Sequence, residues 1–315
     1  MNQPLHLFVT GATGFVGSAV CTEADARGHH VRGAVRTSAP ESVDFDSVAI
    51  GTIGPDTDWR VALQEIDVVI HLAARVHVMK DDIADPLTEF RFTNAQATLQ
   101  LARQAAAAGV KRFIFVSSVK AAGEESTLGK PLCADDEPAP RDAYGISKME
   151  AEQGLLVIAA ATAMSVVIIR PPLVYGPGVK ANFASMMRWL SRGVPLPFGA
   201  IYNRRSLVAL DNLVDLIMLC CHHPAAANQI FMVSDGEDLS TTELLQRMSL
   251  ALGQPARLIP LPANWLCTVA TLFGKANVVN RLCGSLQVDI TKTRQLLGWT
   301  PPVTVDEALR RTAQG

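Results

Sequence analysis

The sequence predicts an α/β fold: a doubly wound parallel sheet followed by a smaller α/β domain. Three observations predict it. A glycine-rich turn separates the first apolar run from the first helical segment, short apolar runs then alternate with helical segments, and a Tyr-x-x-x-Lys spacing opens a later helix. Strands and helices that alternate at this spacing are typical of a parallel sheet covered on both faces.

The first strand and helix flank a turn that suits a phosphate. Apolar residues 5–9 predict a buried strand, and 15–27 predict a helix that ends at Gly28. Glycine in such a turn lets the backbone approach a pyrophosphate, whose charge the helix amides and macrodipole favour. A tight turn without a ligand is the alternative. We therefore expect a Rossmann-type dinucleotide site whose contacts come from Gly11, Thr13, Gly14, Phe15, Val16 and Gly17.

The second strand, 31–36, ends beside the position that an adenosine ribose takes in this fold. An acidic residue there would bind the ribose hydroxyls, but the chain offers Arg36, followed by Thr37 and Ser38. A guanidinium fork and small hydroxyls suit a 2′-phosphate, so NADP(H) is preferred and NAD(H) stays possible. Arg36 stacked on adenine, or simply solvated, is the alternative.

The later elements continue the alternation. Gly109 ends the predicted amphipathic helix 86–108, and the most apolar stretch, 155–169, is interrupted by Thr162 and Ser165, which favours a helix end and a buried strand over a membrane span. The remaining predicted elements are strands 66–72, 112–117, 166–169 and 206–210, and helices 144–163 and 183–192.

Composition limits the classes of function. The chain has 315 residues, 49% of them hydrophobic, and a formal charge of −2, which allows an ample core and gives no basic face for nucleic acid. Six cysteines lack CxxC spacing, and no signal peptide precedes the first strand, so a reduced cytoplasmic protein is expected. The pairs His29–His30 and His222–His223 lack the company of a metal site and are predicted to lie on the surface.

Residue chemistry indicates hydride transfer at a carbinol carbon. Tyr144 and Lys148, four apart on a helix, share one face. An ammonium about 4 Å from the phenol, at an effective dielectric of about 20, favours phenolate by roughly 4 kcal/mol, or about three pKa units. Tyr144 would then exchange the carbinol proton near neutral pH, while Ser118 binds the substrate oxygen. The alternatives are a helix cap for Ser118 and a packing ring for Tyr144.

These motifs together resemble the extended short-chain dehydrogenase/reductase family, in its nucleotide-sugar epimerase, dehydratase and reductase group. The matching pieces are TGATGFVG at 10–17, HLAA at 71–74, FIFVSS at 113–118, YGISK at 144–148 and RPPLVYGPG at 170–178. The resemblance implies Ser118, Tyr144 and Lys148 as the catalytic residues. It also implies further cofactor contacts, from Leu72, Ala73, Ala74, Val116, Tyr144, Lys148, Pro171 and Val174.

The same resemblance implies the organisation of the molecule. Residues 1–175, with a return segment near 203–235, would bind the cofactor, and 176–315 would mainly hold a UDP-sugar. Implied substrate contacts are Asn182, Arg205 and Arg281, with Lys120 beside the sugar, although Asn182 could instead cap helix 183–192 and Lys120 could face solvent. A homodimer through a four-helix interface of 86–108 and 144–163 is also implied.

Choosing within the family depends on local differences. Val119 and Lys120 stand where dehydratases carry an acidic pair, so dehydration lacks its acid and base. SSVKAAGEEST at 117–127 and the ending SLQVDITKTRQLLGWTPP look most like the 4-ketoreductases that reduce UDP-4-keto-6-deoxy-N-acetylhexosamine to UDP-N-acetylquinovosamine for O-antigen and lipopolysaccharide. The alternative is a UDP-hexose 4-epimerase with tightly bound NAD, and a remote one is a non-catalytic cofactor sensor or scaffold.

Overall fold

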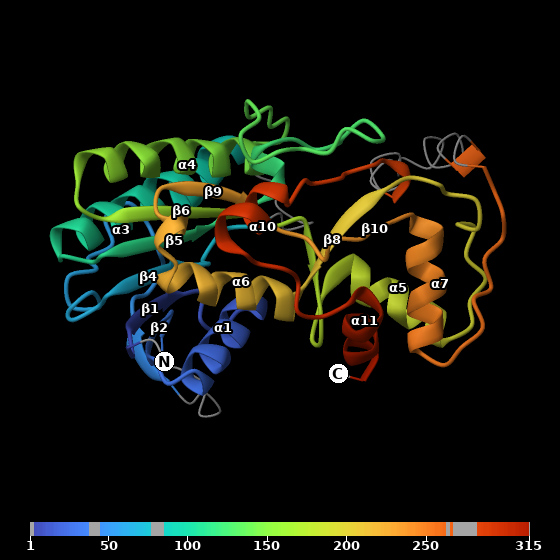
Figure 1. Cartoon of the computed structure of the whole chain (residues 1–315), viewed down its shortest axis with the longest axis horizontal. Coiled ribbons are helices and arrows are strands. Elements are labelled where there is room, and N and C mark those ends of the chain that lie inside the picture. The colour runs from blue at the N-terminus through green and yellow to red at the C-terminus, as the bar shows by residue number, and fades with distance from the viewer. Residues whose placement is uncertain (1–2, 38–44, 77–84, 263–264, 267–281, 315) are drawn as a thin grey trace.

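The computed structural model describes residues 3–37, 45–76, 85–262, 265–266 and 282–314. Its larger sheet has seven parallel strands in the order β3-β2-β1-β4-β5-β6-β9 (Figure 1). This confirms the predicted doubly wound parallel sheet. The strands are β1 (His6–Thr10), β2 (His30–Val35), β3 (Asp46–Ala49), β4 (Val68–His71), β5 (Arg112–Val116), β6 (Ser165–Arg170) and β9 (Gln229–Met232).

Helices cover both faces of this sheet. Helices α1 (Phe15–Ala26) and α6 (Leu210–His222) pack in one apolar core of the sheet, and α3 (Ala97–Ala107) and α4 (Ala143–Ala161) pack in the other. Each face carries its own apolar core, because strands buried on both sides present apolar side chains in both directions. The strand order runs outward from β1 in both directions, and right-handed crossovers, the rule for parallel strands, then place helices on both faces.

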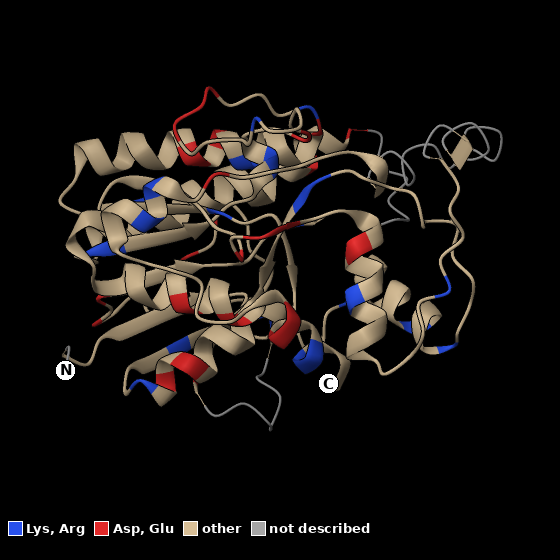
Figure 2. Cartoon of the chain, turned by 45° about the vertical axis from the view of Figure 1, so that its right-hand side comes forward, with Lys and Arg blue, Asp and Glu red and all other residues tan. Residues whose placement is uncertain are grey.

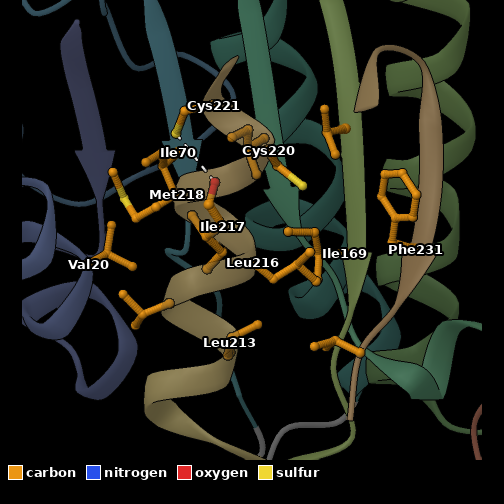
Figure 3. Close-up of a cluster of buried hydrophobic side chains, with 14 of the residues drawn as sticks. Val20, Ile70, Ile169, Leu213, Leu216, Ile217, Met218, Cys220, Cys221 and Phe231 are labelled. Carbon is orange, nitrogen blue, oxygen red and sulfur yellow. Dashed lines mark hydrogen bonds between the residues drawn. The ribbon is translucent and has the colours of Figure 1, made fainter. Parts of the chain in front are cut away.

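Helix α6 shows how the first of these cores is filled. Its buried face, including Leu213, Ile217 and Cys220, packs between α1 and the strands β4, β6 and β9 (Figure 3). The Cys221 thiol donates to the carbonyl of Ile217 at 3.4 Å. Burial raises the pKa of Cys221 to about 12, so this thiol serves as a small apolar filler and not as a nucleophile.

The smaller part of the molecule has its own sheet and core. Its three strands run in the order β10-β8-β7, with β10 antiparallel and β7 parallel to β8. The elements here are β7 (Leu173–Tyr175), α5 (Ala181–Ser191), β8 (Arg205–Ala209), β10 (Asp238–Leu239), α7 (Thr241–Ala251) and α11 (Val305–Gln314). Two short helices, η3 (Pro224–Ala226) and α10 (Thr291–Leu297), lie near β9. The predicted division at residue 175 stays a prediction.

The expected helix 86–108 is interrupted. It consists of α2 (Pro86–Phe90), a π-helical segment η1 (Arg91–Gln96) and α3. Within η1, buried Asn94 donates to Ser147 Oγ on α4 at 3.1 Å and accepts from the amide of Arg75 at 2.8 Å. These contacts explain the π segment, since π-bulges often serve to aim a particular side chain at a functional site.

The surface position predicted for His29 is wrong. Its side chain is buried, its Nδ1 accepts from the amide of Leu5 at 3.2 Å, and its ring lies 5.4 Å from that of His222. Gly28, at φ +79°, turns the chain back after α1 and places His29 against the start of β1. Burial accordingly lowers the pKa of His29.

The described part of the chain shows neither a large patch of like charge in the view of Figure 2 nor a long apolar helix. Acidic and basic residues are interspersed over the helices and loops in the view of Figure 2. None of the described helices is long and apolar enough to cross a membrane. The start of α6 links distant segments, because buried Asn212 donates to Asp235 at 2.7 Å and to the carbonyl of Val303 at 2.8 Å.

Candidate active site

The glycine turn between β1 and α1 forms a close-packed cradle. Gly11 has φ +70°, and a Cβ on Gly17 would lie 2.0 Å from the Gly11 carbonyl oxygen. Thr13 and Gly14 are exposed, and Phe15 and Val16 are half-buried. The first turn of α1 carries no acidic residue, so its free amides face no competing charge. The turn therefore fits a dinucleotide pyrophosphate.

A polar network fixes the neighbouring segment 72–74. The amides of Leu72 and Ala73 both donate to Thr10 Oγ1 at 3.2 Å, and Thr10 Oγ1 also lies 2.6 Å from His71 Nδ1. The other ring nitrogen of His71 contacts Thr98 at 2.8 Å. Burial lowers the pKa of His71 to about 3, so its ring is neutral. Leu72, Ala73 and Ala74 are thus held beside the glycine turn, as a cofactor-lining segment requires.

The other predicted cofactor residues lie along the same edge of the sheet. Arg36 and Thr37 are exposed just after β2, while Ser38 lies outside the described residues. Pro171 is buried between β6 and β7, where its carbonyl accepts from the amide of Val119 at 2.9 Å, and Val174 is half-buried. These positions place Pro171 next to the Ser118 turn.

A cavity of about 690 Å³ opens on one side of the glycine turn. It is lined by Thr13 and Phe15 together with Lys180, Asp211 and Arg311. Ser118, Tyr144 and Lys148 do not line it. We therefore place the reacting centre elsewhere, at the start of α4.

The three predicted catalytic residues do meet there. Ser118 precedes the turn η2 (Val119–Ala121), and its Oγ is hydrogen-bonded to Tyr144 and accepts from the amide of Lys120 at 3.2 Å. The Tyr144 ring packs edge-on against Phe90, with centroids 5.9 Å apart. Lys148 is buried, donates to the carbonyl of Val116 at 2.9 Å, and lies 4.2 Å above the Phe115 ring.

The predicted lowering of the Tyr144 pKa by Lys148 is wrong for this structure. The pKa of Tyr144 is raised to about 12, mainly by burial and also by the charge of Asp142, and the Ser118 hydrogen bond offsets only part of this rise. Burial also lowers the pKa of Lys148 to about 7. The helix spacing did not account for the burial of Lys148 or for the Val116 carbonyl, which accepts a hydrogen bond from Lys148 Nζ. Tyr144 is therefore a phenol at neutral pH, ready to give a proton to a carbonyl oxygen.

Carboxylates that the sequence interpretation missed surround Lys120. Its Nζ forms an ion pair with Asp142, and Glu124 Oε1 lies 3.9 Å away. Residues 119 and 120 are themselves not acidic, but the following loop and the start of α4 place the carboxylates of Glu124 and Asp142 next to Lys120. The signal was the position of Asp142, two residues before Tyr144, where an aspartate caps a helix.

The predicted sugar-binding residues are only partly placed. Arg205 lies on β8 and donates to the carbonyl of Gly284 at 3.0 Å, and Arg281 lies outside the described residues. The alternative N-cap role of Asn182 is wrong, because α5 begins at Ala181 with Lys180 as its cap, which leaves Asn182 exposed in the first turn.

Comparison with known proteins identifies the family. The profile described as the NAD dependent epimerase/dehydratase family matches residues 7–234. The chain belongs to the NAD-dependent epimerase/dehydratase family. It is 47% identical over 317 residues to a protein of Vibrio cholerae named UDP-glucose 4-epimerase, and this match covers 99% of the chain and 96% of that protein.

Solved structures share the fold of this family member over its whole length. MoeE5 in complex with UDP-glucose and NAD superposes with a TM-score of 0.78 at 25% identity, covering 98% of this chain and 97% of that one. UDP-glucuronic acid 4-epimerase from Bacillus cereus, in complex with NAD, superposes with a TM-score of 0.79 at 22% identity, covering 98% and 96%.

Proposed function

We propose that this chain is a UDP-hexose 4-epimerase that keeps NAD bound through the reaction. The observation that carries the proposal is the 47% identity, over nearly the full length of both chains, to the Vibrio cholerae UDP-glucose 4-epimerase. This replaces the ketoreductase as the leading hypothesis. The meeting of Ser118 and Tyr144 just after β5 supports it. Oxidation and re-reduction of the same carbon need a single group that removes a proton from the C4 oxygen and later returns it.

The site residues have distinct proposed roles. Bound NAD would supply the acceptor and then the donor for the C4 hydrogen of the sugar, as hydride. Tyr144, in the phenolate form that the positive charge of bound NAD would favour, takes the proton of the C4 hydroxyl as the carbonyl forms and gives it back when the carbonyl is reduced. Ser118 donates a hydrogen bond to the same oxygen and fixes its distance from Tyr144. Lys148 holds the ribose beside the nicotinamide from its buried position under Tyr144.

In this proposal, residues of the smaller sheet and of the helix beside it bind the UDP moiety. Arg205 on β8 and Asn182 at the exposed start of α5 supply a guanidinium and an amide for the diphosphate and nucleoside, together with Arg281. The sequence expectation of a homodimer stays a proposal too. Phe92 and Val157, which are 45% and 69% exposed on η1 and α4, give that helical face apolar contacts to bury.

A second candidate, the 4-ketoreductase, rests on Arg36. Its exposed side chain follows β2, where a guanidinium would bind the 2′-phosphate of NADPH. A net reductase exchanges its cofactor every turnover, whereas an epimerase regenerates its own. Cofactor requirement therefore separates the two candidates.

The deciding experiment measures products with and without added cofactor. Purified protein is incubated with UDP-glucose, and separately with UDP-N-acetylglucosamine, and the formation of the C4 epimer is followed. Epimer without added cofactor supports the proposal. Stoichiometric loss of NADPH or NADH absorbance with UDP-4-keto-6-deoxy-N-acetylglucosamine, and no epimer, would replace it with the ketoreductase. Tyr144→Phe should lose at least about a hundredfold in turnover, while the matched Tyr202→Phe, at a side chain 78% exposed, should not.

A further inference from the structure

Two segments that are distant in the sequence meet where Ser118 and Tyr144 face each other. Asp142 caps α4, because its Oδ1 accepts from the amide of Gly145 at 2.7 Å. Ser118 caps η2, because its Oγ accepts from the amide of Lys120 at 3.2 Å. Ser118 is therefore itself the cap of η2, and Tyr144 stands in the first turn of the helix that Asp142 caps.

The two caps are joined by side chain and by backbone. The Lys120 ammonium pairs with the second oxygen of Asp142. Below this pair, a Cβ on Gly145 would lie 2.6 Å from the Lys120 carbonyl oxygen, so the start of α4 rests directly on η2. Only glycine allows this approach. The amide of Ala139 also donates to the carbonyl of Ala122 at 2.9 Å, which closes the loop between the two segments.

We propose that Lys120 and Asp142 form a positioning pair, which fastens the Ser118 turn to the start of the Tyr144 helix and neutralises the carboxylate two residues before Tyr144. This inference rests on the proposed role of Tyr144 as acid and base. It gives Lys120 a function other than the direct substrate contact expected from the sequence.

The pairing of Lys120 with Asp142 affects the pKa of Tyr144. Asp142 is the carboxylate whose charge raises the pKa of Tyr144. Burial raises the pKa of Asp142 itself, but its hydrogen bonds to Lys120 and Gly145 outweigh burial and lower it, so Asp142 is charged at neutral pH. Of the other charged groups on these elements, Glu124 lies 3.9 Å from Lys120 Nζ, and Arg91 of η1 is already paired with Glu150. Lys120 is thus the cation that offsets Asp142.

The test is a double-mutant cycle read by the ionisation of Tyr144. The chain has three tyrosines; burial raises the pKa of Tyr175 far above its ordinary value, so a Tyr202→Phe background leaves Tyr144 as the group whose tyrosinate absorbance titrates first. In that background, with NAD bound, Lys120→Met should raise the Tyr144 pKa and Asp142→Asn should lower it, each by about one unit. Asparagine keeps the helix cap.

The double variant decides the matter. If Lys120 acts through Asp142, Lys120→Met in the Asp142→Asn protein should cause no further shift, and Lys120→Arg alone should titrate like the parent. An equal shift from Lys120→Met with and without Asp142 would overturn the proposal, as would no shift in either. In active enzyme, a variant that shifts the Tyr144 pKa should also change kcat/KM near neutral pH, by up to about tenfold. If Lys120→Met instead raised KM and left the Tyr144 pKa unchanged, Lys120 would contact the substrate directly, and the proposal would be overturned.

Controls separate this result from loss of folding and from failure of the proposed function. Lys111 forms an ion pair with Asp67, and its side chain is 77% exposed. Lys111→Met removes this lysine and should leave the pKa of Tyr144 unchanged. Melting temperatures of all variants show whether each is folded. The titration needs no substrate, so it tests the pair even if UDP-hexoses prove not to be turned over.

Discussion

Glu152 and Arg170 form an ion pair between α4 and β6 in which the two side chains are 2% and 1% exposed, with 2.6 Å between Nη2 and Oε2. Arg170 also donates to the carbonyl of Ala134 at 3.2 Å, which anchors the loop after η2. One turn before Glu152 on the same helix stands Lys148. The catalytic helix is therefore fastened to the sheet by a charge pair at the depth of its catalytic lysine.

Glu152→Gln should destabilise the fold strongly. The substitution leaves the Arg170 guanidinium buried without its counter-charge, which costs about 3 to 5 kcal/mol of the free energy of unfolding. Urea unfolding measures this cost. The exposed pair Lys111–Asp67 provides the contrast, because Asp67→Asn should cost no more than about 1 kcal/mol. Similar costs at both positions would contradict the argument from burial.

Lys148 should make stability rise with pH. Burial lowers the pKa of Lys148 from 10.5 to about 7, so between these values the unfolded chain binds a proton that the folded chain has released. Stability contributed by this group therefore increases as pH rises through the window, by at most about 1.4 kcal/mol per pH unit. Urea unfolding at several pH values should show this slope in the wild type and a smaller one in Lys148→Met. Parallel slopes would mean that Lys148 titrates normally.

Gly17→Ala should weaken NAD binding. The added Cβ meets the Gly11 carbonyl at 2.0 Å, and relieving that overlap moves the turn that faces the pyrophosphate. A strain of about 1 to 3 kcal/mol corresponds to roughly five- to a hundredfold weaker binding. Calorimetric titration with NAD gives the affinity. Gly28→Asn, at the other end of α1, has open space around its Cβ and should bind NAD like the wild type.

Arg36→Asp tests the cofactor preference. If the guanidinium binds a 2′-phosphate, its replacement should weaken NADPH by about tenfold to a hundredfold and change NADH little. The two dissociation constants are measured side by side. Equal losses for both cofactors would remove Arg36 from any role in recognising the phosphate.

Arg205→Ala should raise the KM for the UDP-sugar by about tenfold with little change in NAD affinity. The neighbouring Arg204→Ala is the matched control, because Arg204 pairs with Glu243 at 3.0 Å and has a side chain 44% exposed. Steady-state kinetics with saturating cofactor make the comparison. Unchanged substrate kinetics in the Arg205 variant would take this residue out of the diphosphate site.

The sequence predicted the large sheet well because its signals are local. Apolar runs, the glycine turn and Gly109 each mark an element within a few residues. The π segment at 91–96 was missed because it depends on Asn94 reaching Ser147 across to α4. Strand β9, only Gln229–Met232, was missed because its pairing with β6 joins segments far apart in the chain.

In the candidate site, too, local signals were predicted correctly and contacts between distant groups were not. Residue types and spacing were enough to single out Ser118, Tyr144 and Lys148 as neighbours. Their protonation depended on features that spacing does not reveal, namely the burial of Lys148 and Tyr144 and the charge of the Asp142 carboxylate on Tyr144. Helix geometry predicts which side chains share a face, but burial and competing partners decide their charge.

The position of β9 limits how this protein can be divided. The chain leaves the large sheet after β6, builds β7, α5 and β8, and only then returns with β9 to pair along β6. Without β9, the backbone of Val167–Arg170 would become an open and largely apolar edge, the kind of edge that recruits other strands and aggregates. A fragment ended after β7 would consequently be insoluble, and transplanting the smaller sheet onto a relative would have to carry β9 with it.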